Sequence, residues 1–422
     1  MGFQQGLSGL NGAAKSLDVI GNNVANASTV GFKQAQAQFA DMYANSMNRS
    51  GNSPVGIGVT VANVAQAFTQ GNISTTNNPL DIAINGDGFF QLGLTPDNKS
   101  PLYGRNGQFE LNKDGYIVNP SMNGAYLMGW AAGVSGGDPT ALKIDTSAMK
   151  ATPTTSVTTK VNLDSRQSVP TVTPFDPADP NSYNNSTGVT MYDSLGNPYS
   201  VQTYYVKGAT AGAPPTTTWS IYATVDGTTY GSNPATPPIV PAAVGTMTFD
   251  STGTMTATTG MSMDMTFYAK AGGTFPGLVS LAYTGSTQTG SAFVNLAQSQ
   301  NGMAPGTLSS FSIAKDGTIV GSYSNQQTKN LGTVVLVNFA NPNGLQPIGN
   351  NLYQATSDAG QPLVGQPTTG TFGTLQARAV EDSNVDLTAE LVNMIVAQRV
   401  YQANSQTIKV QDTVLQTLVS MR

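Results

Sequence analysis

The last 49 residues of this chain, positions 374–422, contain no glycine and no proline. The chain as a whole is rich in both, with 46 glycines and 24 prolines among 422 residues. At that frequency about eight would fall in a segment of this length, and these two residue types disfavour helix more than any other. The segment therefore predicts one long helix over residues 385–420. Ser383, three residues before Asp386, predicts a capping box at its start.

Both ends of the chain carry large apolar residues at a seven-residue spacing. Near the C-terminus these are Leu387, Met394, Tyr401, Ile408 and Leu415, with Leu391 and Ile395 beside them. Near the N-terminus they are Phe3, Leu10, Leu17 and Val24, with Leu7 beside them. Such a repeat is typical of helices that pack on partners at a shallow angle. We expect the two terminal helices to pair as a coiled-coil-like domain whose apolar positions form an assembly seam.

Glycines weaken the N-terminal helix. Five of them lie within the first 21 residues, and each costs roughly 1 kcal/mol relative to alanine inside a helix. We therefore expect this segment to be disordered in the monomer and to fold only against a partner. The alternative is an ordinary helical hairpin within one chain. The length of the C-terminal helix and the lack of further helices favour self-assembly.

The middle of the chain has the pattern of β-strands. Short apolar runs alternate with Asn-Gly, Asp-Gly and proline-containing turns. The pattern Phe-x-Leu-x-Lys-Asp-Gly-x-Ile-Val at residues 109–118 returns, with isoleucine for leucine, at residues 311–320. Both copies predict a hairpin with a Lys-Asp-Gly turn. The fold class is therefore mainly β with long terminal helices.

Changes in composition along the chain predict four parts. Residues 1–30 and 384–422 form the terminal helical assembly domain, and residues 31–70 and 376–383 are linkers. Residues 71–146 and 303–375 form a split β domain, into which residues 147–302 insert a second, outer β domain. Residues 32–70 permit either helix or extended chain. Phe32, Phe39, Tyr43 and Met47 have helical spacing, but the segment from Gly51 to Gly58 breaks it.

Composition excludes several kinds of chemistry. The chain has no cysteine and no histidine, so it can form neither a disulfide nor a Ser-His-Asp relay. A formal net charge of −5 argues against nucleic acid as a partner. The Asp-Gly positions lack the ligand spacing of a calcium loop and are interpreted as turns. We expect no catalytic residues, metal or cofactor, and no membrane insertion or cleaved signal. A glycosidase using Asp176 and Asp179 is the enzymatic alternative.

Two terminal motifs carry a specific resemblance. The first runs from Leu17 to Lys33 and includes Asn22, Asn23, Asn26, Gly31 and Phe32; the second begins Ser-Asn-Val-Asp-Leu at residues 383–387. Together they resemble the bacterial flagellar rod and hook family. Central blocks at residues 85–90 and 105–109 resemble segments found in several members of the family, whereas those at residues 192–197 and 316–332 are similar to its hook members.

The resemblance implies a non-enzymatic structural subunit of the flagellar hook, a curved flexible tube that joins rod to filament and transmits torque as a universal joint. It also implies that the subunit is exported by the flagellar type III apparatus to the extracellular flagellum. The implied partners are further copies of itself, the distal rod subunit, the hook cap and the hook-filament junction proteins. A distal rod or junction subunit of the same family, or a β-rich surface adhesin, is the alternative.

Overall fold

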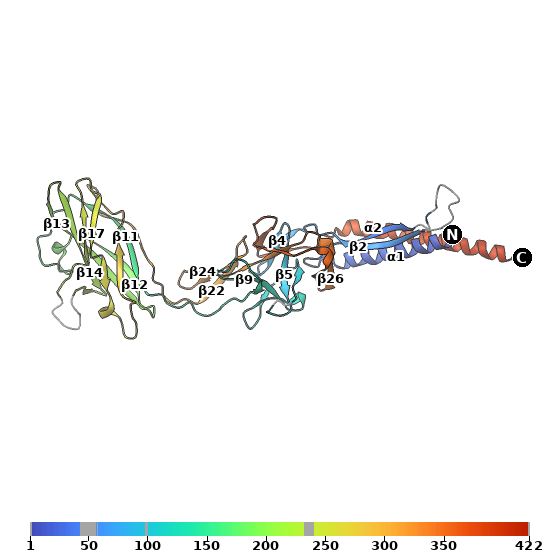
Figure 1. The fold of residues 1–422 in the computed structure, drawn as a ribbon, viewed down its shortest axis with the longest axis horizontal. Coiled ribbons are helices and arrows are strands. Elements are labelled where there is room, and N and C mark those ends of the chain that lie inside the picture. The colour runs from blue at the N-terminus through green and yellow to red at the C-terminus, as the bar shows by residue number, and fades with distance from the viewer. Residues whose placement is uncertain (1, 43–55, 57, 98–99, 232–239, 421–422) are drawn as a thin grey trace. The chain divides into compact units, whose positions relative to one another are not determined.

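The computed structural model describes residues 2–42, 56, 58–97, 100–231 and 240–420. The described residues form two long helices, one near each terminus, and many short strands between them (Figure 1). This confirms the mainly β fold class. The chain divides into two compact units: the first comprises Met1–Thr146, Ser310–Ser322 and Thr328–Arg422, and the second comprises Ser147–Ser309 and Tyr323–Gln327. The second unit thus includes residues 303–309 and 323–327, which lie outside the segment 147–302.

The C-terminal helix α2 spans Leu387–Ser420 without interruption. Its N-cap is Asp386, whose Oδ1 accepts hydrogen bonds from the backbone N–H groups of Thr388 at 2.9 Å and Ala389 at 3.1 Å. The predicted capping box is therefore wrong, because it made Ser383 the N-cap. Ser383 lies outside the helix, where its Oγ accepts a hydrogen bond from the N–H of Val385.

The N-terminal helix α1 spans Gly2–Ala25 and packs along α2. Small residues make the contact: a Cβ added to Gly6 would lie 3.1 Å from Ile408, and one added to Gly9 would lie 2.7 Å from Asn404. The glycines that weaken the helix therefore allow close approach of the two backbones. The partner that α1 was expected to need comes, in this structure, from the same chain.

The first predicted linker contains a hairpin. Strands β1 (Ala35–Met42) and β2 (Gly58–Gln66) pair antiparallel and pack on α1. The helical alternative for residues 32–70 is thus wrong for the described part, while Tyr43 and Met47 lie outside it. The second predicted linker also contains strands, because β29 (Thr374–Ala377) pairs with β4 (Ile82–Asn85) and β30 (Ala379–Glu381) pairs with β3 (Ile73–Thr75).

The rest of the first unit is a β body that draws its strands from both sides of the insertion. Those strands are β3 (Ile73–Thr75), β4 (Ile82–Asn85), β5 (Phe89–Gly93), β6 (Leu102–Gly104), β7 (Glu110–Leu111), β8 (Ile117–Asn119), β9 (Ala125–Ala131), β10 (Thr140–Ala141), β24 (Thr328–Val334), β25 (Leu336–Asn338), β26 (Leu345–Gly349), β27 (Leu352–Ala355) and β28 (Leu363–Gly365). Strands β22 (Leu308–Ile313) and β23 (Thr318–Tyr323) belong to the first unit over residues 310–322. The core of this β body contains four aromatic rings that pack edge to face, those of Phe89, Tyr103, Phe339 and Tyr353.

Both predicted Lys-Asp-Gly hairpins are confirmed. Strand β7 pairs with β8, and β22 is the neighbour of β23 in the sheet. The turns contain Gly115 at φ +82° and Gly317 at φ +83°. Glycine adopts this left-handed conformation without a steric penalty, which explains its place in both motifs.

The second unit consists of two sheets packed on a shared core. One sheet has the order β12-β13-β14-β16-β17 with β15 paired to β14, and the other has the order β18-β19-β11-β20 with β21 paired to β11. The strands are β11 (Ser156–Asp164), β12 (Asn185–Tyr192), β13 (Pro198–Ala211), β14 (Thr216–Val225), β15 (Thr228–Thr229), β16 (Gly245–Phe249), β17 (Met255–Thr259), β18 (Ser262–Asp264), β19 (Leu278–Ala282), β20 (Thr287–Thr289) and β21 (Val294–Gln300). Trp219 and Phe249 from the first sheet meet Leu163 and Val279 from the second, as in a β-sandwich.

Replacing Gly9 by leucine should disrupt the helix pair, whereas the same change at Gly21 should not. A Cβ at Gly21 meets no atom within 4 Å. We expect Gly9→Leu to lower the stability of the paired helices by about 1–3 kcal/mol through overpacking. Gly21→Leu should raise it by up to about 1 kcal/mol, because leucine is the better helix former. Thermal unfolding followed by circular dichroism at 222 nm measures both, and equal melting of the two variants would contradict this packing.

Candidate functional site

Most of the large apolar residues of the terminal helices stay exposed in a single copy. The exposed members of the predicted seam are Phe3, Leu7, Leu387, Leu391, Tyr401 and Leu415. The half-buried members are Leu10, Leu17, Val24, Met394 and Ile408. Ile408 lies against Gly6 in the α1–α2 contact, whereas the exposed members of the seam keep much of their surface outside it. Its role in assembly stays a prediction.

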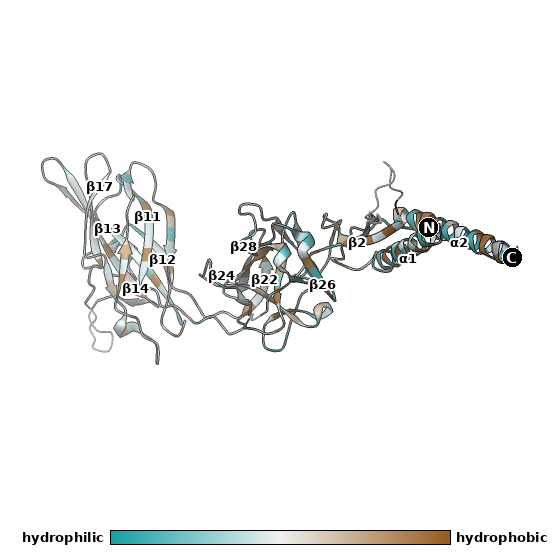
Figure 2. Ribbon diagram, turned by 45° about the vertical axis from the view of Figure 1, so that its right-hand side comes forward, coloured by the Kyte–Doolittle hydropathy of each residue, from teal (hydrophilic) through white to brown (hydrophobic). Residues whose placement is uncertain are grey.

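Helix α2 exposes more apolar surface than a seven-residue repeat predicts. Val392, Val396, Val400, Val410 and Val414 are also exposed, and Figure 2 shows hydrophobic residues recurring along α2 up to its C-terminal end. We missed these valines because they fall off the seven-residue spacing; their own four-residue spacing was the available signal. A helix with apolar residues on several faces needs cover from outside its own chain.

The N-terminal motif residues form the end of α1 and the turn that follows. The buried side chain of Asn23 donates to the carbonyl of Ala35 at 2.8 Å and accepts from its N–H at 2.9 Å, so it imitates a neighbouring strand at the start of β1. The side chain of Asn26 donates to the backbone carbonyl of Asn22. Asn22 is exposed. These contacts end the helix and direct the chain into the hairpin.

Gly31 is the point of closest approach between this turn and the β body. Its φ is +72°, and an added Cβ would lie 2.6 Å from the backbone nitrogen of Asn106. Its N–H donates to the carbonyl of Glu381 at 2.8 Å. The next residue, Phe32, is half-buried and donates its N–H to the carbonyl of Thr29. A side chain at position 31 would separate the terminal segments from the β body.

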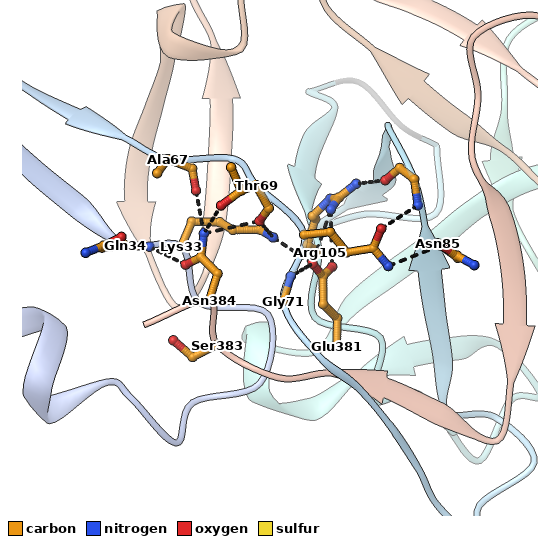
Figure 3. A network of polar contacts seen from close by, with 12 residues as sticks. Lys33, Gln34, Ala67, Thr69, Gly71, Asn85, Arg105, Glu381, Ser383 and Asn384 are labelled. Carbon is orange, nitrogen blue, oxygen red and sulfur yellow. Dashed lines mark hydrogen bonds and ion pairs between the residues drawn. The ribbon is translucent and has the colours of Figure 1, made fainter. Parts of the chain in front are cut away.

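A buried ion cluster lies behind this turn (Figure 3). The Glu381 carboxylate accepts from Lys33 Nζ at 2.7 Å, from Arg105 Nη1 at 3.3 Å and from the N–H of Gly71 at 2.9 Å. All three charged side chains are almost fully buried. Arg105 also donates to the carbonyls of Gly86 and Gly88. The cluster therefore ties residues from four distant parts of the first unit to one carboxylate.

Burial shifts the pKa of Lys33 in this cluster. Desolvation lowers the pKa of the Lys33 amine from its usual value, the Arg105 charge lowers it further, and Glu381 raises it. The two cations together outweigh one carboxylate, so the carbonyl oxygen of Thr69, 2.7 Å from Lys33 Nζ, contributes to the balance. Sequence analysis quoted Lys33 and Arg105 only within motifs and missed Glu381, for which the sequence shows no signal.

A second polar group connects the start of α2 to the hairpin. Asn384 accepts from the N–H of Gln34 at 2.7 Å and donates to the carbonyls of Ala67 and Thr69. The Gln34 amide in turn donates to Glu390 Oε1 at 2.6 Å. Together with the ion cluster, this group fixes where both terminal helices leave the β body.

The remaining candidates carry structural hydrogen bonds. Asp176 and Asp179 accept from backbone N–H groups of their own turns, at Ala178 and Asn181 respectively. Across the described ranges, no group of three or more acidic residues is placed to hold a metal ion. In the same ranges no helix is long and apolar enough to cross a bilayer.

Family models of flagellar proteins match most of the chain. Residues 3–33 match the flagella basal body rod protein, residues 83–161 the flagellar hook protein FlgE/F/G D1 domain, residues 162–303 the flagellar basal body protein FlaE D2 domain and residues 376–421 the flagellar basal body rod FlgEFG protein C-terminal.

Relatives of full length also match. The chain is 43% identical to the flagellar hook protein FlgE of Escherichia coli (strain K12) over 429 residues, and 43% identical to that of Salmonella typhimurium over 435 residues, with 100% of each chain covered. The crystal structure of Helicobacter pylori flagellar hook protein FlgE2 is similar with a TM-score of 0.56, at 16% identity, over 73% of this chain and 100% of that one.

Replacing Glu381 by alanine should destabilise the first unit strongly. The change leaves Lys33 and Arg105 buried without their counter-charge, and breaking a buried pair in this way costs about 3–5 kcal/mol. Glu110→Ala, at an exposed position of β7, is the control and should change the unfolding free energy by less than about 0.5 kcal/mol. Urea unfolding of both full-length variants gives the two values. A loss below about 1 kcal/mol for Glu381→Ala would show that the cluster is dispensable.

Proposed function

The chain belongs to the flagellar hook protein family, and from this we infer that its exposed helix surface is what joins one hook subunit to the next. Members of this family are structural subunits of the hook, which is part of the extracellular flagellum next to the basal body. The observation that supports our inference is the apolar surface that the helix pair leaves uncovered, including Leu7, Leu391 and Leu415. In a polymer, neighbouring copies would cover it.

The energy of this association comes from burial of apolar side chains. Each large side chain contributes roughly 1.5–3 kcal/mol when it is removed from water. The terminal helices offer many of them, whereas only 10% of the chain is charged. We propose that the seam residues and the flanking valines provide most of the association energy and that the buried ion cluster holds the helices in place.

We propose that the two β units carry the flexibility of a curved tube that transmits torque. Of the four ion pairs among the described residues, two lie in the second unit: Asp226–Lys270 is exposed on both sides, and Asp164–Arg166 joins a buried carboxylate to an exposed guanidinium. Surface pairs of this kind contribute about 1 kcal/mol or less. Polar surfaces that exchange equivalent hydrogen bonds can slide at low net cost. The predicted four-part division of the chain would thus correspond to an assembling part and a sliding part.

Further partners follow from the position of a hook in the flagellum. We propose that the chain contacts the distal rod subunit at one end of the polymer and the cap and the hook-filament junction proteins at the other. Export by the flagellar type III apparatus is part of the same proposal. The full-length match to hook relatives, which includes the inserted unit, favours a hook subunit over a rod subunit.

Replacing Leu391 by aspartate should block polymerisation without unfolding the chain. Leu391 is exposed in a single copy, so the change should alter the unfolding free energy by no more than about 0.5 kcal/mol. Loss of its burial between copies should raise the critical concentration at least tenfold. Leu296→Asp, at an exposed apolar position of β21 in the second unit, is the control and should assemble normally. Sedimentation and negative-stain electron microscopy measure assembly, and tubes from Leu391→Asp at the wild-type yield would refute the inference.

A further inference from the structure

A groove of about 690 Å³ lies between the helix pair and the β1–β2 hairpin. Its walls include Gly12 of α1, Phe39 of β1, Val59 of β2, and Val396 and Val400 of α2. Phe39, Val396 and Val400 are exposed. The groove is therefore an open, partly apolar surface within the first unit, continuous with the uncovered valines of α2.

One polar group at this groove is incompletely satisfied. Glu390 lines the groove and is 3% exposed. Its Oε1 accepts from Gln34, but its Oε2 is buried and has no hydrogen-bond partner among the described residues. The described lining contains no lysine or arginine. A buried carboxylate oxygen without a donor is costly, so this site calls for a donor from outside the chain.

The C-terminal end of α2 projects past α1. Because Gly6 lies against Ile408 and Gly9 against Asn404, the helices run antiparallel, and Gly2 falls level with about residue 412 at equal rise per residue. Residues 413–420 therefore extend roughly 12 Å beyond the start of α1 at about 1.5 Å per residue, as Figures 1 and 2 both show. Val414, Leu415 and Val419 on this projecting end are exposed.

The projecting end cannot fill the groove of its own chain. Both belong to one uninterrupted helix, and the groove residues of α2 end at Asn404. A contact between the end of one copy and the groove of another joins two different surfaces. Such a heterologous contact repeats without closing when its rotation does not complete a ring, and it then produces an open helical polymer.

We propose that residues 409–420 of α2 in one copy, which are the projecting end and the turn before it, dock into the α1–α2–hairpin groove of the next copy, and that Lys409 of the docked helix donates to Glu390 Oε2. This rests on the proposed function and deepens it, because it states which surfaces meet. An amphipathic helix in a groove inserts side chains at four-residue spacing, which Val410 and Val414, and Leu415 and Val419, provide. Lys409 is exposed at the base of the projecting end, so its charge complements the single acid of the groove.

Cysteine cross-linking tests the docking directly, because the chain has no native cysteine. Chains carrying Val396→Cys are copolymerised with chains carrying Val414→Cys and treated with a mild thiol oxidant. The control replaces Val396→Cys by Ile395→Cys, which is similarly exposed but does not line the groove. We expect the disulfide between the two kinds of chain, identified by mass spectrometry of its peptides, to form at least tenfold more with position 396 than with position 395. Equal yields, or no such disulfide in well-formed tubes, would overturn the proposal.

A double-mutant cycle tests the polar contact and does not depend on cysteine. Glu390→Gln and Lys409→Met should each raise the critical concentration about tenfold, as loss of a charge-assisted hydrogen bond does. The double variant should be no worse than either single variant, because the two residues act on one contact. Multiplicative effects, or wild-type assembly by Glu390→Gln, would overturn the assignment. The wild-type chain distinguishes this proposal from the proposed function. If the wild-type chain forms tubes but the variants do not behave as expected, only the docking is wrong; if the wild-type chain forms no tubes, the proposed function is wrong.

Discussion

The close approach of α1 to α2 is the constraint on which the rest of the structure depends. Gly6 and Gly9 bring the two backbones together, so the contact within one chain consumes few large side chains. Leu7, Leu391 and the exposed valines therefore remain available on the outside. A helix pair built on leucine would have buried this surface internally and left little for other copies. In this chain, weak helix propensity and the exposed apolar surface of the helix pair therefore have the same origin.

Few residues of this chain are charged, and three of the buried charged side chains lie together in one cluster. Glu381 binds Lys33 and Arg105 away from water, whereas each ion pair of the second unit has an exposed cation. A buried cluster of this kind contributes positional specificity more than net stability. It fixes the exit of both helices from the β body, so the exposed stripes keep a defined orientation to the body that carries them.

The sequence predicted the kinds of element better than their contacts. Absence of glycine and proline located α2, and the Lys-Asp-Gly repeat located two hairpins, because both signals are local. The face that α1 uses against α2 was not predictable from large apolar residues, because glycine carries the contact. Strands β29 and β30 were taken for a linker, since their partners lie about 300 residues earlier. The role of Glu381 was not predictable for the same reason, because Lys33 and Arg105 are brought near it only by the fold.

The separation of 348 residues between Lys33 and Glu381 also orders events in time. A ribosome makes the chain from its N-terminus, so both cations exist long before the carboxylate that neutralises them. Until then the turn after α1 has no anchor, and α1 has no α2 to lie against. Formation of the cluster therefore waits for the final tenth of translation, and a polypeptide that stops before residue 381 lacks the carboxylate that anchors the exit of both terminal helices.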